Sequence, residues 1–138
     1  MINFHIENIA IKIQHKLKLK NWLKSIITSE GFSLGEINYI FCSDDYLLKI
    51  NIEYLDHDYF TDIITFDNSL EESLIEGDIF ISIDRVKENA LTYEVSFEHE
   101  LKRVLAHGIL HLCGFFDKTP EEEKLMRSKE NHYLQQFS

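Results

Sequence analysis

The sequence predicts a single α+β domain, residues 1–138, in which about five helices pack on a mixed four-stranded sheet. Segments rich in β-branched and aromatic residues alternate only in part with segments of helical periodicity, which favours a sheet of mixed direction. One proline and five glycines leave no stretch typical of a flexible linker. A chain of this length buries roughly two-thirds of the surface that its unfolded form exposes, so one core is sufficient.

The N-terminal part is predicted to form a strand, a helix and a second strand. The first strand is expected near residues 2–6, and the helix from about 11 to 30. Apolar residues at helical spacing indicate this helix: Leu17, Trp22, Leu23, Ile26 and Ile27. Gly31 and Gly35 are expected to bracket the turn into a strand at 36–42.

The rest of the chain contains two more strand-like runs and four helical segments. Ser43 is typical of a helix N-cap, and a helix is expected from there to about Tyr54. Residues 62–66 and 78–83 are β-branched and aromatic runs of strand length. Three further helices are predicted at about residues 84–93, 97–112 and 120–136, the last with Pro120 at its first position.

The formal net charge of −10 disfavours indiscriminate nucleic-acid binding, which depends on Lys and Arg neutralising phosphates. Residues 12–24 nevertheless hold five lysines and no acidic residue, so this segment is either a basic binding face or a solvated helix surface. Cys42 and Cys113 form no CxxC pair and are expected to be buried thiols. With no membrane-span-like stretch and no signal-peptide pattern, a cytoplasmic protein without a membrane partner is expected. Nothing in the sequence specifies an oligomeric state.

The chemistry of the chain is concentrated in residues 107–117. His107, His111 and Asp117 have the spacing H-x3-H-x5-D, which is typical of a metal ion with three protein ligands. At the end of a central helix, the two histidines lie one turn apart on one face. Three protein ligands leave a position open for water or substrate, as in catalytic zinc sites.

Gly114 is expected to end this helix in the left-handed conformation. The reversal should turn Phe115 and Phe116 inward and return Asp117 toward the histidines. Gly108 occupies the position where the metalloprotease motif H-E-x-x-H carries its general base, so a protease would lack that base. The alternative is that both histidines are polar residues of an amphipathic helix and that Asp117 is an ordinary loop residue.

Residues 107–114, HGILHLCG, resemble the signature of the YbeY family, H-G-x-L-H-L-x-G followed by a third ligand. The segments 61–66, TDIITF, and 77–82, GDIFIS, resemble the family's T-D-V-L-S-F and G-D-I-x-I-S strands. Asn51 and Tyr54 fall at its N-x-x-Y, and the matches follow the family order across about residues 46–114.

The resemblance implies a metal-dependent, single-strand-specific endoribonuclease that acts in rRNA maturation and ribosome quality control. It implies one divalent metal ion, with zinc expected, held by His107, His111 and Asp117. Precursor rRNA and ribosome-associated proteins are the implied partners. The nucleophile is either hydroxide or a 2′-hydroxyl of the RNA. Thr61, Asp62 and Thr65 are candidates to line the cleft, although Asp62 would repel phosphate unless it orients a ligand or a water; alternatively it is a polar residue that opens a strand.

The chain departs from the family pattern at two positions. The usual third ligand is histidine, and Asp117 should make the site more tolerant of harder ions such as manganese. Leu55 stands where the family usually has an arginine associated with activity. Arg103, one turn before His107, is a candidate catalytic substitute that could bind a phosphate; the alternative is a salt bridge to Glu100 or a neighbouring acid.

Two other classes of function stay open at this point. A non-catalytic ribosome-assembly factor is consistent with Leu55 and Asp117, since both departures could weaken catalysis. A metallohydrolase that acts on a small molecule or a peptide would keep the metal and fit the acidic composition.

Overall fold

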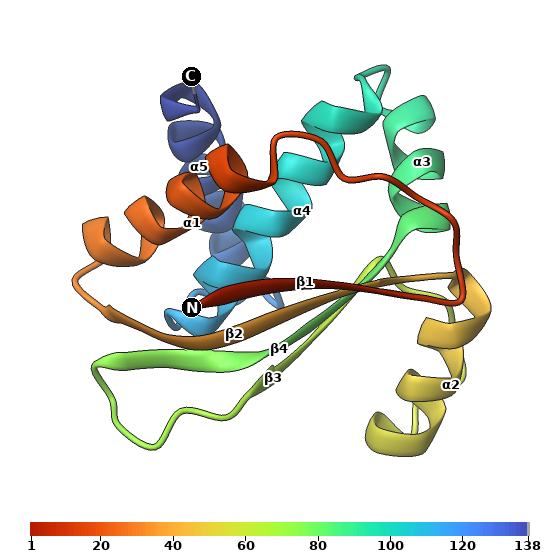
Figure 1. Ribbon diagram of the computed structural model, residues 1–138, viewed down its shortest axis with the longest axis horizontal. Coiled ribbons are helices and arrows are strands. Elements are labelled where there is room, and N and C mark those ends of the chain that lie inside the picture. The colour runs from red at the N-terminus through yellow and green to blue at the C-terminus, as the bar shows by residue number, and fades with distance from the viewer. Residues whose placement is uncertain (138) are drawn as a thin grey trace.

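The computed structural model describes residues 1–137, which form one four-stranded sheet with helices on both faces (Figure 1). The strands are β1 (Ile2–Glu7), β2 (Ser33–Cys42), β3 (Ile63–Asp67) and β4 (Leu74–Ser82). The helices are α1 (Lys16–Ser29), α2 (Asp44–Leu55), α3 (Ile83–Thr92), α4 (Phe97–Leu112) and α5 (Pro120–Gln136). The predicted α+β class, with a mixed four-stranded sheet and five helices, is confirmed.

The strand order is β1-β2-β4-β3, and the sheet is mixed because only β3 runs against its neighbour. The larger part of the core lies between one face of this sheet and the group α1, α4 and α5. Tyr39 of β2 is fully buried there, and its hydroxyl donates a 2.7 Å hydrogen bond to the backbone oxygen of Leu105 in α4. Helix α2 covers part of the opposite face through a smaller cluster around Leu47 and Ile64.

Helix α4 lies close to the sheet because Gly108 has no side chain. A Cβ at this position would come within 3.0–3.2 Å of Ile79 and Ile63, which is tighter than ordinary van der Waals contact. The helix therefore packs directly against β4 and β3 at this position, next to His107.

Capping residues explain why most helix bounds agree with the sequence predictions. Ser43 accepts a hydrogen bond from the backbone N–H of Tyr46, as expected of an N-cap. Thr119 and Glu122 form a reciprocal capping box at the start of α5.

None of the helices within residues 1–137 combines the length and the apolar composition that a membrane crossing requires.

Three local predictions in the N-terminal part are wrong. Leu17, expected as an apolar anchor of the first helix, is 74% exposed, and Leu19 is buried instead. Helix α1 begins at Lys16 and not near residue 11, because Ile9, Ile11 and Ile13 alternate with exposed residues. These isoleucines pack against the core from a non-helical segment, and a two-residue period does not suit a helix. Gly35 lies within β2, at an irregularity in its pairing with β4, and not at the end of the preceding turn. A Cβ at Gly35 would overlap the side chain of Glu76.

Candidate active site

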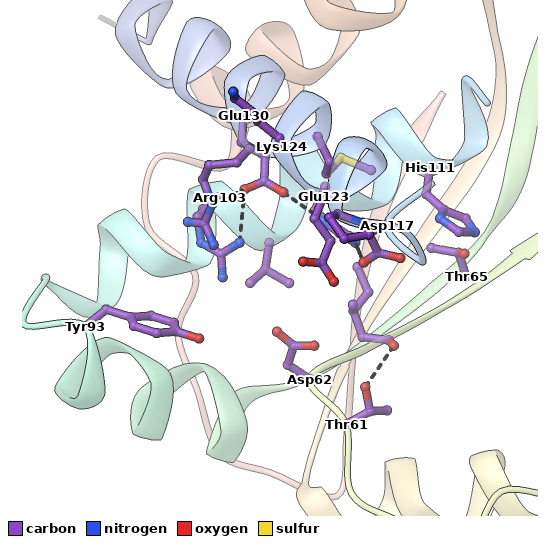
Figure 2. A pocket seen from close by; sticks show the side chains of 16 residues that line it. Thr61, Asp62, Thr65, Tyr93, Arg103, His111, Asp117, Glu123, Lys124 and Glu130 are labelled. Atoms are coloured by element: carbon purple, nitrogen blue, oxygen red, sulfur yellow. Dashed lines mark hydrogen bonds and ion pairs between the residues drawn. The ribbon is translucent and has the colours of Figure 1, made fainter. Parts of the chain in front are cut away.

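A cleft of about 760 Å³ opens between α4, α5 and the start of β3, and it contains all four site residues predicted from the sequence (Figure 2). Helix α4 contributes Arg103, His107 and His111, and the following loop contributes Asp117. The other walls include Thr61, Asp62 and Thr65 at β3, Tyr93 after α3, and Glu123, Lys124, Arg127 and Glu130 of α5.

His107 is oriented by a buried carboxylate. Its Nδ1 lies 2.7 Å from Oε2 of Glu130, whose side chain is only 2% exposed. Burial acts to raise the pKa of Glu130, but the hydrogen bond to His107 and the charge of Arg103 outweigh it, so the pKa lies below its usual range. An ionised carboxylate only accepts hydrogen bonds, so Nδ1 of His107 donates to Glu130, and in the neutral imidazole with this tautomer Nε2 presents its lone pair to the cleft.

That Nε2 faces Asp117 across a short gap. The distance from His107 Nε2 to Asp117 Oδ2 is 3.4 Å. Two ligand atoms, each about 2.0–2.1 Å from a tetrahedral zinc ion, lie roughly 3.3–3.4 Å apart. This pair therefore has the spacing of two ligands to one ion, and the hydrogen bond from His107 to Glu130 is the kind of outer-shell support that metal-binding histidines have.

His111 lines the same cleft one turn further along α4. Burial and the neighbouring His107 lower the pKa of His111, which favours the neutral imidazole that metals bind. Within residues 1–137, however, no group of three or more His, Cys, Asp or Glu side chains is arranged so that it could hold a metal ion. The structure thus brings His107, His111 and Asp117 into one cleft without closing them around a common point, and their role as ligands stays a prediction.

The turn after α4 follows the expectation at three of its four positions. Gly114 has a φ of +102°, and the backbone N–H groups of Gly114 and Phe115 bond back into the last turn of the helix. Phe115 packs against the core. The expectation for Phe116 is wrong: this residue is 47% exposed, and its ring packs edge-on against His111.

Arg103 is held by two buried glutamates. Its guanidinium donates two hydrogen bonds to Glu100 and one, of 3.0 Å, to Glu130. Although burial opposes the charge, these carboxylates raise the pKa of Arg103 above its already high usual value. The ion pair with Glu100 is therefore present as the sequence alternative anticipated, and three of the five guanidinium N–H groups are used. A phosphate contact by Arg103 stays a prediction.

Asp62 lines the cleft, whereas the lysines of α1 do not. Asp62 lies on its floor, where burial raises the pKa of its carboxyl. Asn89 donates a 3.4 Å hydrogen bond to Asp62. In contrast, the lysines of α1 do not line the cleft; Lys18 lies over the ring of Phe137 and Lys20 over the ring of Phe4. Leu55 also lies outside the cleft lining.

The two cysteines are free thiols, Cys42 buried and Cys113 partly buried. Burial raises the pKa of both to about 12, which favours the neutral thiol at each position.

Glu130 is a site residue that the sequence predictions missed, whereas Glu100 was named only as a possible ion-pair partner of Arg103. Glu130 stands between Met126 and Tyr133 in the buried stripe of α5, where its i, i+4 spacing from Met126 marks a carboxylate among core positions. Such an interruption indicates a buried charge that needs a partner. The identity of the partner depends on the packing of α5 against α4, which no local pattern specifies.

The family model described as "Endoribonuclease YbeY" matches this chain over residues 1–138. The chain belongs to the YbeY family. A relative from Flavobacterium psychrophilum, named endoribonuclease YbeY, is 55% identical over 137 residues, which are 99% of this chain and 96% of the relative. One from Cytophaga hutchinsonii with the same name is 53% identical over 133 residues, or 96% and 93% of the two chains.

A YbeY-like fold is also found among solved structures. The solution structure of TM1509 from Thermotoga maritima superimposes with a TM-score of 0.69 at 29% identity, covering 99% of this chain and 89% of the other. The family resemblance inferred from HGILHLCG and the two strand segments is therefore confirmed. The chain spans nearly the whole length of these relatives, so the cleft between α4 and α5 belongs to the region that they share.

Proposed function

We propose that this YbeY family member is a metal-dependent, single-strand-specific endoribonuclease that acts in rRNA maturation and ribosome quality control. The name of its relatives, endoribonuclease YbeY, supports RNA cleavage. The observation that carries the site is the arrangement of Glu130, His107 and Asp117: a buried carboxylate fixes the imidazole, and the free nitrogen lies 3.4 Å from a second carboxylate.

One divalent ion, with zinc expected and manganese tolerated, fits this donor set of two imidazoles and a carboxylate. When bound, it would supply Lewis acidity at the phosphate to be cleaved. Glu130 keeps the proton on Nδ1 of His107, and the fold holds His111 in its neutral form. Asp117, 46% exposed, is free to adjust its carboxylate toward the two histidines.

The rest of the cleft would position RNA. Arg103 retains two unused N–H groups at the cleft wall, and Lys124 and Arg127 add positive charge from α5. These cations would offset the repulsion of phosphate by Asp62 and Glu123. Precursor rRNA and ribosome-associated proteins are the proposed partners, and the cytoplasm is the proposed compartment.

The test combines metal content with cleavage. Protein purified without chelators should contain close to one equivalent of zinc or manganese and should cut unstructured RNA but not a duplex of the same sequence. His107→Ala should lose both metal and cleavage. His99→Ala is a matched control, because His99 is an exposed histidine on the same helix outside the cleft lining. Parent protein that cleaves RNA equally well without any metal would refute the metal-dependent site.

A non-catalytic ribosome-assembly factor is the second candidate. It is favoured by one observation: Arg103, the candidate replacement for the family arginine, already binds Glu100 and Glu130. In that case the His107→Ala variant should associate with ribosomal particles as the parent does and should restore normal rRNA processing in cells that lack the gene. If the protein is an endoribonuclease, the His107→Ala variant should fail to restore rRNA processing.

A further inference from the structure

A second depression, about 480 Å³ in volume, lies on the outer surface of α5 and adjoins the cleft. Lys124 and Arg127 line both hollows, so they form the boundary between them. The second depression is lined by Lys124, Arg127, Ser128, Asn131, His132 and Gln135.

These six residues form one exposed stripe that contains no carboxylate. Their spacing repeats every three or four residues, which places them along one side of the helix, and all six are exposed. Lys124 and Gln135 are eleven positions apart, or roughly 16 Å along the helix axis. In a chain with a net charge of −10 and four glutamates on this same helix, a continuous surface of cations, amides and one imidazole suits an anionic, hydrogen-bonding ligand.

Both cations of the stripe are available to such a ligand. The side chain of Arg127 is 54% exposed, and its nearest carboxylate oxygen, on Glu130, lies 3.8 Å away, beyond hydrogen-bond distance. Lys124 makes no ion pair with any residue in 1–137. Arg103, in contrast, is engaged on two sides, so Lys124 and Arg127 are the more available phosphate contacts at the mouth of the cleft.

We propose that the stripe on α5 is a binding track for single-stranded RNA that leaves the cleft. Lys124 and Arg127 bind the phosphates next to the cleavage site, and Asn131, His132 and Gln135 contact the following nucleotide through hydrogen bonds and stacking on the imidazole. The inference rests on the proposed endoribonuclease function. RNA is favoured over a peptide because the lining offers no apolar pocket for an anchoring side chain.

The test uses two RNAs and two charge-matched variants. An RNA trinucleotide occupies the cleft alone, whereas a longer unstructured RNA also reaches the stripe. Asn131→Glu with Gln135→Glu adds two negative charges to the far half of the stripe. Ala10→Glu with Ser73→Glu adds the same two charges at exposed positions outside α5, outside both hollows and outside the lysine-rich segment 12–24. Binding is followed by fluorescence anisotropy, cleavage by gel, and folding by thermal melting.

The stripe variant should bind the longer RNA at least about fivefold more weakly than the control variant, because the introduced carboxylates face phosphates. Its trinucleotide binding and melting temperature should match those of the control. In a second measurement, Lys124→Ala with Arg127→Ala should reduce the slope of log affinity against log salt by up to about 1.4, or about 0.7 for each lost phosphate contact.

Equal binding of the longer RNA by the stripe and control variants would overturn the track, while RNA cleavage by the parent would leave the proposed function standing. If the stripe variant binds RNA normally but no longer sediments with ribosomal particles, the surface serves a protein and the RNA track is again overturned. A parent protein that binds neither RNA would overturn the proposed function together with the track.

Discussion

Replacing Glu130 by glutamine should weaken metal binding although Glu130 is not a proposed ligand. The ionised carboxylate accepts from Nδ1 of His107 and from Arg103 at the same time, at 2.7 and 3.0 Å. A glutamine amide has one oxygen and one NH₂ group. If its oxygen faces His107, its NH₂ group opposes the guanidinium. If its NH₂ group faces His107, the ring must move its proton to Nε2, which removes the lone pair that faces Asp117.

These contacts give the expected size of the loss in metal affinity and of the loss in folding stability. Loss of an outer-shell partner of a metal-binding histidine costs about 10- to 100-fold in affinity, or roughly 1.4–2.7 kcal/mol. Without metal, the variant loses one charge-assisted hydrogen bond, worth about 1.5–3 kcal/mol in the free energy of unfolding. Arg103 keeps its two bonds to Glu100, so the guanidinium is not left without a partner and the domain should still fold.

Zinc affinity of the metal-free protein would be measured by chelator competition, and stability by urea denaturation. Glu121→Gln serves as the control, because it removes the same charge from an exposed position in the first turn of α5. A Glu130→Gln protein that is folded and binds zinc as tightly as the control would refute the role of Glu130 in orienting His107.

Three further outcomes are expected. Asp117→Ala should weaken metal binding strongly, whereas Asp117→His should keep the site and favour zinc over manganese. Calorimetry with both ions measures these affinities. An alanine variant that binds metal as tightly as the parent would exclude Asp117 as a ligand. Because burial raises the pKa of Asp62, the fold disfavours the charged form of this carboxyl. Asp62→Asn should therefore increase the free energy of unfolding of the metal-free protein at neutral pH. This gain in stability should vanish as the pH falls below the ordinary aspartate pKa of about 4. Urea denaturation against pH tests it, and a gain that does not change with pH would contradict this cause. Gly77→Ala should lower the free energy of unfolding by about 1–3 kcal/mol, because a Cβ there overlaps the backbone oxygen of Phe66. Gly31→Ala is a comparison variant in open space that carries only the strain of its φ of +87°. Urea denaturation measures both, and an unchanged stability of Gly77→Ala would contradict the overlap.

The sequence was most informative where local rules govern the structure. Capping by Ser43 and Thr119 and the left-handed Gly114 all depend on a few neighbouring residues, and their predictions agree with the structure. The helix start near residue 11 failed because apolar residues with a two-residue period were counted as part of a helix. The strand order could not be predicted, since β2 lies between β1 and β4 through contacts distant in sequence.

In the candidate site, too, the contacts set by neighbouring residues were predictable and those between distant segments were not. His107 and His111 are one turn apart on a single helix, so their common face follows from helix geometry alone. Asp117 approaches His107 because Gly114 reverses the chain. Glu130, by contrast, reaches His107 from another helix, 23 positions further along the chain. Sequence spacing cannot specify that contact, because it depends on how α5 packs against α4.

The position of Gly108 limits how this cleft can be redesigned. His107 points into the cleft while the next residue faces Ile79 and Ile63, so a glutamate introduced to create H-E-x-x-H would place its carboxylate against the core. It would lift α4 from the sheet and carry His107 away from Asp117, instead of supplying a base. A protein engineer seeking peptide hydrolysis would therefore have to introduce the base from the opposite wall, at Thr61 or Thr65 beside β3.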